Sequence, residues 1–150
     1  MGFKARSAPL RAPELKRHAK GEDMKKSRYG PCGLYCGACG ATDCGGCQSD
    51  FIDEYVEQCA FRRCAKDKGL EFCCFCSQYP CAEINEFMND EWPHHWTMEP
   101  NLEFIKEHGK REWLQAQARE WRCKSCGLEV MWYQKECTCG RELDAWDAPA

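Results

Sequence analysis

Cysteine occupies 15 of the 150 positions in this chain, a density typical of scaffolds held together by disulfide bonds or metal ions. The mean hydropathy is −0.71, so few aliphatic side chains are available to form a large core. A chain of this length otherwise has to bury about two-thirds of the surface that its unfolded form exposes. The cysteines must therefore supply part of the stability that a hydrophobic core normally provides.

The context of the cysteines favours metal ions over disulfides. Disulfide-rich domains are exported behind a signal peptide, whereas Met1 to Pro9 contain no apolar run of that kind. No apolar stretch reaches the roughly 18 residues of a membrane span. An odd number of cysteines would also leave one thiol without a disulfide partner. We therefore expect a cytoplasmic protein that has no membrane association and whose reduced thiols bind metal.

Charge is distributed unevenly along the chain. Residues 1–30 carry nine Lys and Arg against three Asp and Glu, whereas the rest carries 12 against 21. Nucleic-acid-binding domains are usually basic, so we expect protein partners for the folded part. Nucleic acid is expected to bind only through the basic tail, residues 1–28, which should be flexible because Pro9 and Pro13 interrupt any early helix.

The last four cysteines form the most specific motif. Cys123-x2-Cys126-Gly127 is followed by Cys137-x-Cys139-Gly140. Two thiolates from each of two tight turns complete a tetrahedral zinc site, and four protein ligands leave no open position for catalysis. Because Leu128 to Gln134 is rich in strand formers, we predict a small antiparallel zinc ribbon over residues 122–150. The short Cys-x-Cys spacing leaves two alternatives, a distorted turn or a different ligand.

Eleven further cysteines lie between residues 29 and 81. Thiolates suit zinc and iron–sulfur clusters alike, so either could occupy this region, and the spacing does not fix which thiols share an ion. The first three have the spacing that binds the cluster of radical S-adenosylmethionine enzymes, but 150 residues without βα alternation cannot build the barrel of those enzymes. We interpret all but Cys74 as metal ligands, namely Cys32, Cys36, Cys39, Cys44, Cys47, Cys59, Cys64, Cys73, Cys76 and Cys81.

The first cysteine region resembles the domain of unknown function 3795 family. The resemblance covers about residues 29 to 90, and Cys74 is additional to it. It implies a cytoplasmic metal-binding domain, followed by a helical segment that leads to a zinc ribbon, and it implies no particular reaction. The segments that carry it, in order, are Cys32-Gly33-Leu34-Tyr35-Cys36, Cys44-Gly45-Gly46-Cys47, Cys59 with Cys64, and Cys73-x2-Cys76-x3-Pro80-Cys81.

Apolar residues at helical spacing predict several helices. One is expected from Phe51 to Lys68, ended by Gly69, and a short one after Pro80. Pro100 to Trp121 should form a further helical segment that is broken or kinked at Gly109.

His94 and His95 are adjacent, and adjacent side chains point in different directions in most backbones. We therefore interpret them, together with Trp92 and Trp96, as an aromatic cluster packed against the helices and not as paired ligands. The chain contains no nucleophile-elbow, phosphate-loop or dinucleotide-binding motif.

These patterns together predict a small metal-stapled α+β protein. Its parts are the tail (residues 1–28), a cysteine-rich metal-binding domain (29–90), a helical connector (91–121) and a zinc ribbon (122–150). The predicted function is that of a zinc-binding adaptor or accessory module of a larger assembly, without catalysis of its own. The alternative is an iron–sulfur or thiol redox protein that uses the N-terminal cysteines.

Overall fold

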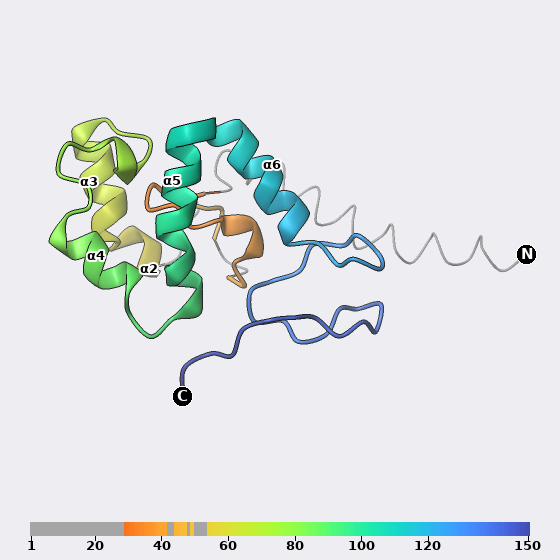
Figure 1. Ribbon diagram of the computed structural model, residues 1–150. Coiled ribbons are helices and arrows are strands. Elements are labelled where there is room, and N and C mark those ends of the chain that lie inside the picture. Colours follow the sequence, from red (N-terminus) through yellow and green to blue (C-terminus); the bar gives the residue numbers. More distant parts are fainter. Residues whose placement is uncertain (1–28, 42–43, 48, 50–53) are drawn as a thin grey trace, which may run out of the picture.

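The computed structural model describes residues 29–41, 44–47, 49 and 54–150. Short helices joined by loops make up this part of the chain (Figure 1). The basic tail, residues 1–28, lies outside the described residues. The α-helices and 3-10 helices (η) are η1 (Cys36–Ala38), α2 (Glu54–Glu57), α3 (Ala60–Lys68), η2 (Cys73–Phe75), α4 (Ala82–Met88), η3 (Pro93–Thr97), α5 (Met98–His108) and α6 (Lys110–Glu120).

The helix predicted over residues 51–68 is divided in two. α2 ends at Glu57, and Cys59 has an extended backbone with φ −63° and ψ 120°, from which it serves as the N-cap of α3. α3 ends as predicted, because Gly69 adopts the left-handed φ of +66° and its N–H bonds to the carbonyls of Ala65 and Lys66. The predicted beginning at Phe51 lies outside the described residues.

The predicted helices after Pro80 and around Gly109 are confirmed. α4 begins at Ala82, with Cys81 as its N-cap directly after Pro80, and α5 and α6 meet at Gly109, whose φ of +89° favours glycine. Pro100 lies in the first turn of α5, where a missing N–H costs no helical hydrogen bond. Within the described residues, none of the helices combines the length and apolar character needed to cross a membrane.

Trp113 of α6 lies at the centre of the main core. Its side chain is 1% exposed, and the rings of Tyr29, Tyr35 and Phe72 surround it at centroid distances of 6.4, 6.3 and 6.0 Å. The core thus contains residues of the cysteine-rich segment together with residues of α5 and α6, the helices that were predicted to be a connector. The division of the chain into four parts stays a prediction. Further members from the helices are Phe61, Ile84, Met88, Met98, Leu102 and Ile105.

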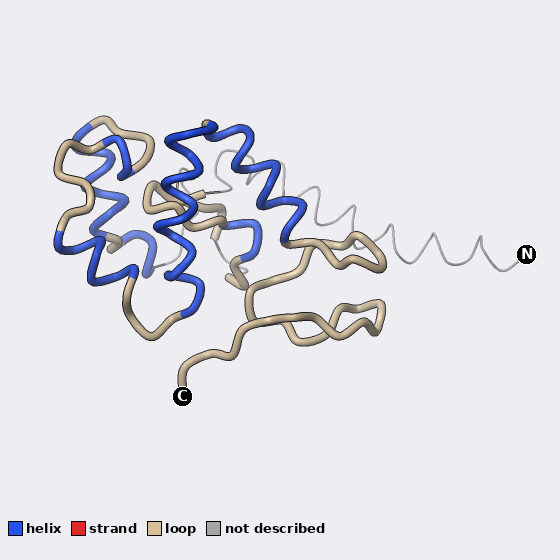
Figure 2. The backbone as a smooth tube through the Cα atoms, viewed as in Figure 1, coloured by secondary structure: helices blue, strands red, loops and turns tan. Residues whose placement is uncertain are grey.

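The predicted antiparallel zinc ribbon, and with it the α+β class, is wrong. The described residues contain helices and loops but no strand or sheet (Figure 2). In the C-terminal segment, two isolated bridges pair Arg122 with Glu129 and Glu136 with Glu142.

The strand-forming residues between the two cysteine pairs pack into two different hydrophobic clusters. Val130 joins a small second cluster with Cys123 and Cys137, whereas Trp132 packs into the main core. The chain then turns, with the N–H of Gln134 donating to the carbonyl of Met131 at 3.2 Å. Because residues two apart enter separate cores, this segment cannot run straight as one edge of a ribbon.

Candidate metal centre

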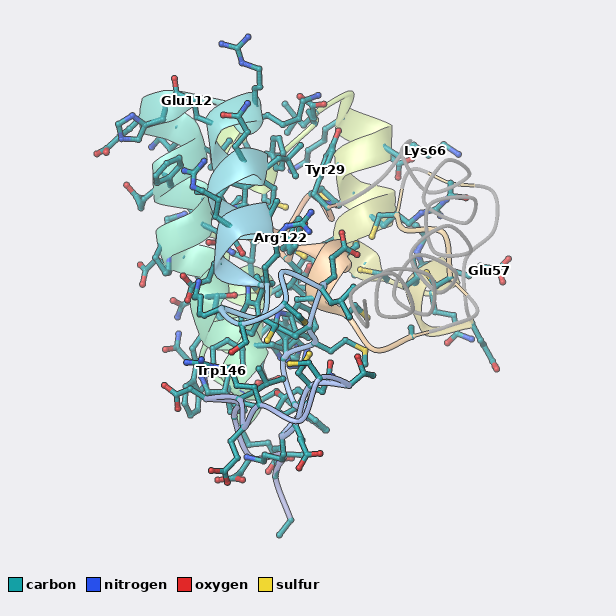
Figure 3. All side chains as sticks on the ribbon, turned by 90° about the vertical axis from the view of Figure 1, so that its right-hand side faces the viewer. Tyr29, Glu57, Lys66, Glu112, Arg122 and Trp146 are labelled. Carbon is teal, nitrogen blue, oxygen red and sulfur yellow. The ribbon has the colours of Figure 1, made fainter. Side chains whose placement is uncertain are left out.

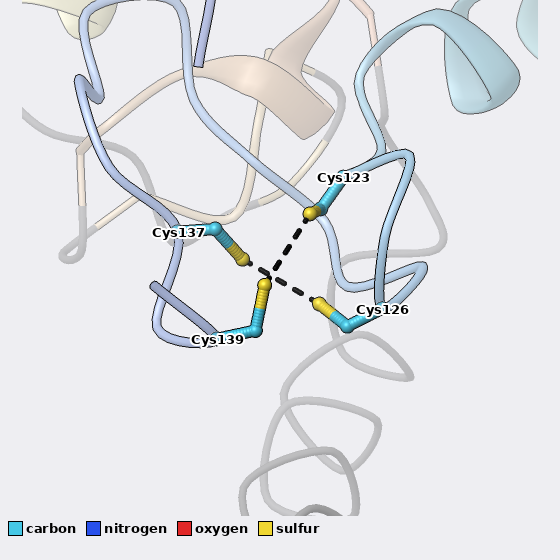
Figure 4. Close-up of side chains that lie close together, drawn as sticks. All are labelled: Cys123, Cys126, Cys137 and Cys139. Carbon is cyan, nitrogen blue, oxygen red and sulfur yellow. Dashed lines mark hydrogen bonds between the residues drawn. The ribbon is translucent and has the colours of Figure 1, made fainter. Parts of the chain in front are cut away.

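Cys123, Cys126, Cys137 and Cys139 bring their sulfur atoms together where two loops meet (Figure 4). All four Sγ atoms lie within 4.8 Å of one another. Two of the separations between the loops are 3.7 Å, from Cys123 to Cys139, and 3.5 Å, from Cys126 to Cys137. Four sulfurs placed tetrahedrally at about 2.3 Å from a zinc ion lie about 3.8 Å apart. The cluster could therefore hold a metal ion with little rearrangement.

Both loops turn at a glycine that directly follows the second cysteine. Gly127 has φ +76° and donates its N–H to the carbonyl of Cys123 at 2.8 Å, while Gly140 has φ +90° and donates to Cys137 at 2.8 Å. Glycine reaches this left-handed backbone without strain. The second loop is one residue shorter, but its glycine still directly follows Cys139. The short spacing therefore leaves Cys139 within the cluster.

Hydrogen bonds close each of the two loops and also join one loop to the other. The N–H of Cys123 donates to Leu128 and that of Cys137 donates to Arg141, each at 2.9 Å. Arg141 Nη1 also donates to Ser125 Oγ in the other loop at 2.9 Å. Arg122, at the entry to the first loop, and Trp146, after the second, are labelled in Figure 3.

Backbone N–H groups directed at the sulfurs favour a thiolate at this centre. The N–H groups of Cys126 and Ser125 lower the pKa of Cys123 to about 6, against the opposing effect of burial. The N–H of Leu128 lowers the pKa of Cys126, but burial and the three neighbouring thiols raise it to about 12. The backbone thus stabilises the thiolate of Cys123, whereas deprotonation of a second thiol in the cluster requires a cation among the sulfurs.

The cysteines of the first region are less tightly grouped. Over the described chain, no other set of three or more potential ligands lies within 4.8 Å of one another. Cys32 and Cys47 both lie beside Gly30, where an added Cβ would meet their sulfurs at 3.2 and 3.3 Å, and Cys36 interacts with Cys47 and Cys32. A hydrogen bond with Cys47, followed by burial, raises the pKa of Cys36 well above its ordinary value.

A second set lies around one cavity, which Cys64, Cys73, Cys76 and Cys81 line. Burial, and then the charges of nearby thiols including Cys64, Cys81 and Cys59, raise the pKa of Cys73 to about 12.

The other cysteines are placed as follows. Cys44 accepts a hydrogen bond of 3.4 Å from the N–H of Gly46. Cys39 and Cys59 are half-buried against the main core, and Cys74 is buried within it.

His94 and His95 belong to an aromatic cluster with Trp92, as interpreted from the sequence, whereas Trp96 is 55% exposed. The His94 ring stacks on Trp132 at 4.4 Å, and its Nδ1 lies 2.7 Å from the hydroxyl of Tyr133. His95 Nδ1 lies 2.8 Å from the carboxylate of Asp90. Sequence reasoning missed Asp90 and Tyr133, since neither has a spacing from the histidines that indicates contact.

Comparison of the chain with protein-family models, with curated proteins and with solved structures finds no match. The case for metal binding therefore depends on the geometry of the cysteine cluster.

Proposed function

We propose that the protein binds a zinc ion at Cys123, Cys126, Cys137 and Cys139, and that this ion is structural. The observation that carries the proposal is the pair of sulfur separations, 3.5 and 3.7 Å, close to those of tetrahedral thiolate coordination. They far exceed the length of a disulfide bond, about 2.05 Å. Four protein ligands leave no coordination position for substrate or water, so the ion stabilises the fold.

The role proposed for the folded chain is that of an adaptor or accessory module in a larger, cytoplasmic assembly. Large apolar side chains remain exposed outside the core, which supports a protein partner. The excess of acidic residues after residue 30 argues against a nucleic-acid partner for this part. The exposed side chains are Phe75 (54%), Trp92 (37%), Trp96 (55%) and Met131 (41%).

The test is metal analysis of the full chain purified without oxygen. Zinc and iron per chain are measured for the wild type, for Cys123→Ser/Cys126→Ser, and for Ser125→Ala as the control from the same loop. We expect the double variant to lose one zinc per chain and the control to lose none, because Ser125 offers no thiolate. An unchanged zinc content in the double variant overturns the proposal.

The same preparation separates zinc from the iron–sulfur alternative, which the closeness of Cys32, Cys36 and Cys47 supports. A colourless protein that contains zinc but no iron excludes a redox cluster at those thiols. A brown protein with several irons per chain assigns the redox function to them instead.

A further inference from the structure

Four cysteines from three separate elements line one cavity of about 40 Å³. Cys64 lies in α3, and Cys81 is the N-cap of α4. Cys73 is the first residue of η2, and Cys76 directly follows its last residue. A site for one water molecule needs about 10–15 Å³ by the same measure, so this cavity has room for a metal ion.

The short 3-10 helix η2 brings two of these cysteines close together along the chain. Its backbone closes with the N–H of Cys76 donating to the carbonyl of Cys73 at 3.0 Å. Cys73 begins this helix and Cys76 caps its end, and both residues line the cavity. Cys74, between them, enters the main core at 5% exposure and does not line the cavity.

The sulfur of Cys76 has the backbone environment found at the C-terminal centre. The N–H of Gln78, two residues further along the chain, donates to it at 3.4 Å, just as the N–H of Leu128 is directed at Cys126. Such donors stabilise the thiolate that a metal ion requires. Lys68 Nζ also lies 3.4 Å from the Cys76 sulfur, so a cation already occupies the edge of this cysteine set.

We propose that Cys64, Cys73, Cys76 and Cys81 form a second thiolate site, which takes one divalent metal ion of the zinc class. The ion draws in sulfurs that lie further apart than those of the C-terminal centre. It fastens α3 to η2 and to the beginning of α4, three elements that the chain joins only through turns. The site shares no residue with the C-terminal centre, so each binds its ion independently.

Zinc content tests the site with a matched pair of variants. We expect Cys73→Ala/Cys76→Ala to lose one zinc per chain relative to the wild type. Cys74→Ala removes a thiol from the same turn and should lose none. Cys123→Ser/Cys126→Ser should lose a separate equivalent, so failure of either site is distinguishable from failure of the other. A double variant that retains the wild-type zinc content, or a Cys74→Ala variant that loses as much zinc, overturns the proposal.

Alkylation of the wild-type chain gives a readout that does not depend on the folding of a variant. Cys64 is exposed and Cys76 is half-buried, so iodoacetamide can reach both unless an ion holds them. We expect both to be protected in the zinc-loaded protein and to become reactive after chelation, as followed by mass spectrometry of peptides. Equal rates of alkylation before and after chelation overturn the second site.

Discussion

The backbone N–H of Trp132 donates a hydrogen bond of 3.0 Å to the carbonyl of Ala38, which joins the C-terminal segment to the first cysteine region. Ala38 is fully buried at the end of η1. Trp132 lies on the connection between the two cysteine loops, which extend from it on the same side (Figure 1). The main core therefore holds the connection, while the loops themselves depend on their own contacts.

Removal of the proposed zinc ion should loosen the loops and leave the helical core intact. The cluster inside the loops contains three buried residues, Cys123, Val130 and Cys137, with Trp121, Cys126 and Leu143 packed against them, so the proposed ion would supply much of its stability. We expect the amides of Gly127 and Gly140 to exchange quickly with deuterium after chelation, while those of α5 and α6 stay protected. Hydrogen exchange with and without added zinc measures this, and an equal loss of protection in α6 would contradict it.

Two glycines with positive φ should respond differently to alanine. Gly69 has φ +66° and open space around its Cα, so Gly69→Ala should cost only the backbone strain, about 1–2 kcal/mol. Gly33 has φ +90°, and a Cβ there would lie 2.9 Å from Leu102 Cγ and 3.1 Å from the carbonyl oxygen of Met98. This crowding should add about 1–3 kcal/mol. Urea unfolding of the two variants, each with zinc added, gives their free energies of unfolding. A larger loss of stability in Gly69→Ala than in Gly33→Ala would contradict the prediction.

Trp113 should be the most sensitive aromatic position in the core. Trp113→Ala removes a ring that is 1% exposed, and we expect it to cost about 3–5 kcal/mol. Trp113→Phe should cost much less, because Nε1 has no hydrogen-bond partner among the described residues and an aromatic ring is retained. Thermal and urea unfolding of the two variants test the difference. A phenylalanine variant as unstable as the alanine variant would show that the core does not accept the smaller ring.

His94 should make the protein less stable in mild acid. Burial, and then the charge of His95, lower the pKa of His94 from its ordinary 6.5 to about 4. The neutral ring therefore stabilises the fold fully above pH 6.5, and this contribution is lost as the pH falls from 6.5 to 4. We expect a loss of about 1–2 kcal/mol, less than the full shift implies because the ring is only partly buried.

The control for this pH dependence is His94→Gln, which cannot titrate. Acid also protonates the thiolates, and both proteins share that effect, so the difference between their unfolding curves isolates His94. Identical curves for wild type and His94→Gln between pH 4 and 6.5 would contradict the prediction.

Local spacing was sufficient for the features that depend on a single turn of chain. The end of α3 at Gly69 and the break between α5 and α6 at Gly109 follow from backbone conformations that favour glycine. The grouping of the four C-terminal cysteines is of the same kind, since each pair of cysteines lies within one loop. The interactions that decide these features join residues only a few positions apart, so the local sequence pattern is enough to predict them.

Packing between distant segments accounts for what the spacing did not predict. Val130 and Trp132 have strand-forming side chains, but they pack into different hydrophobic clusters. The expected antiparallel ribbon therefore does not form. Cys73 and Cys74 are neighbours in sequence, yet one faces the cavity and the other the core. Which surface each side chain meets depends on how segments that are distant in sequence pack in the main core, and the spacing of residues along the chain does not encode that arrangement.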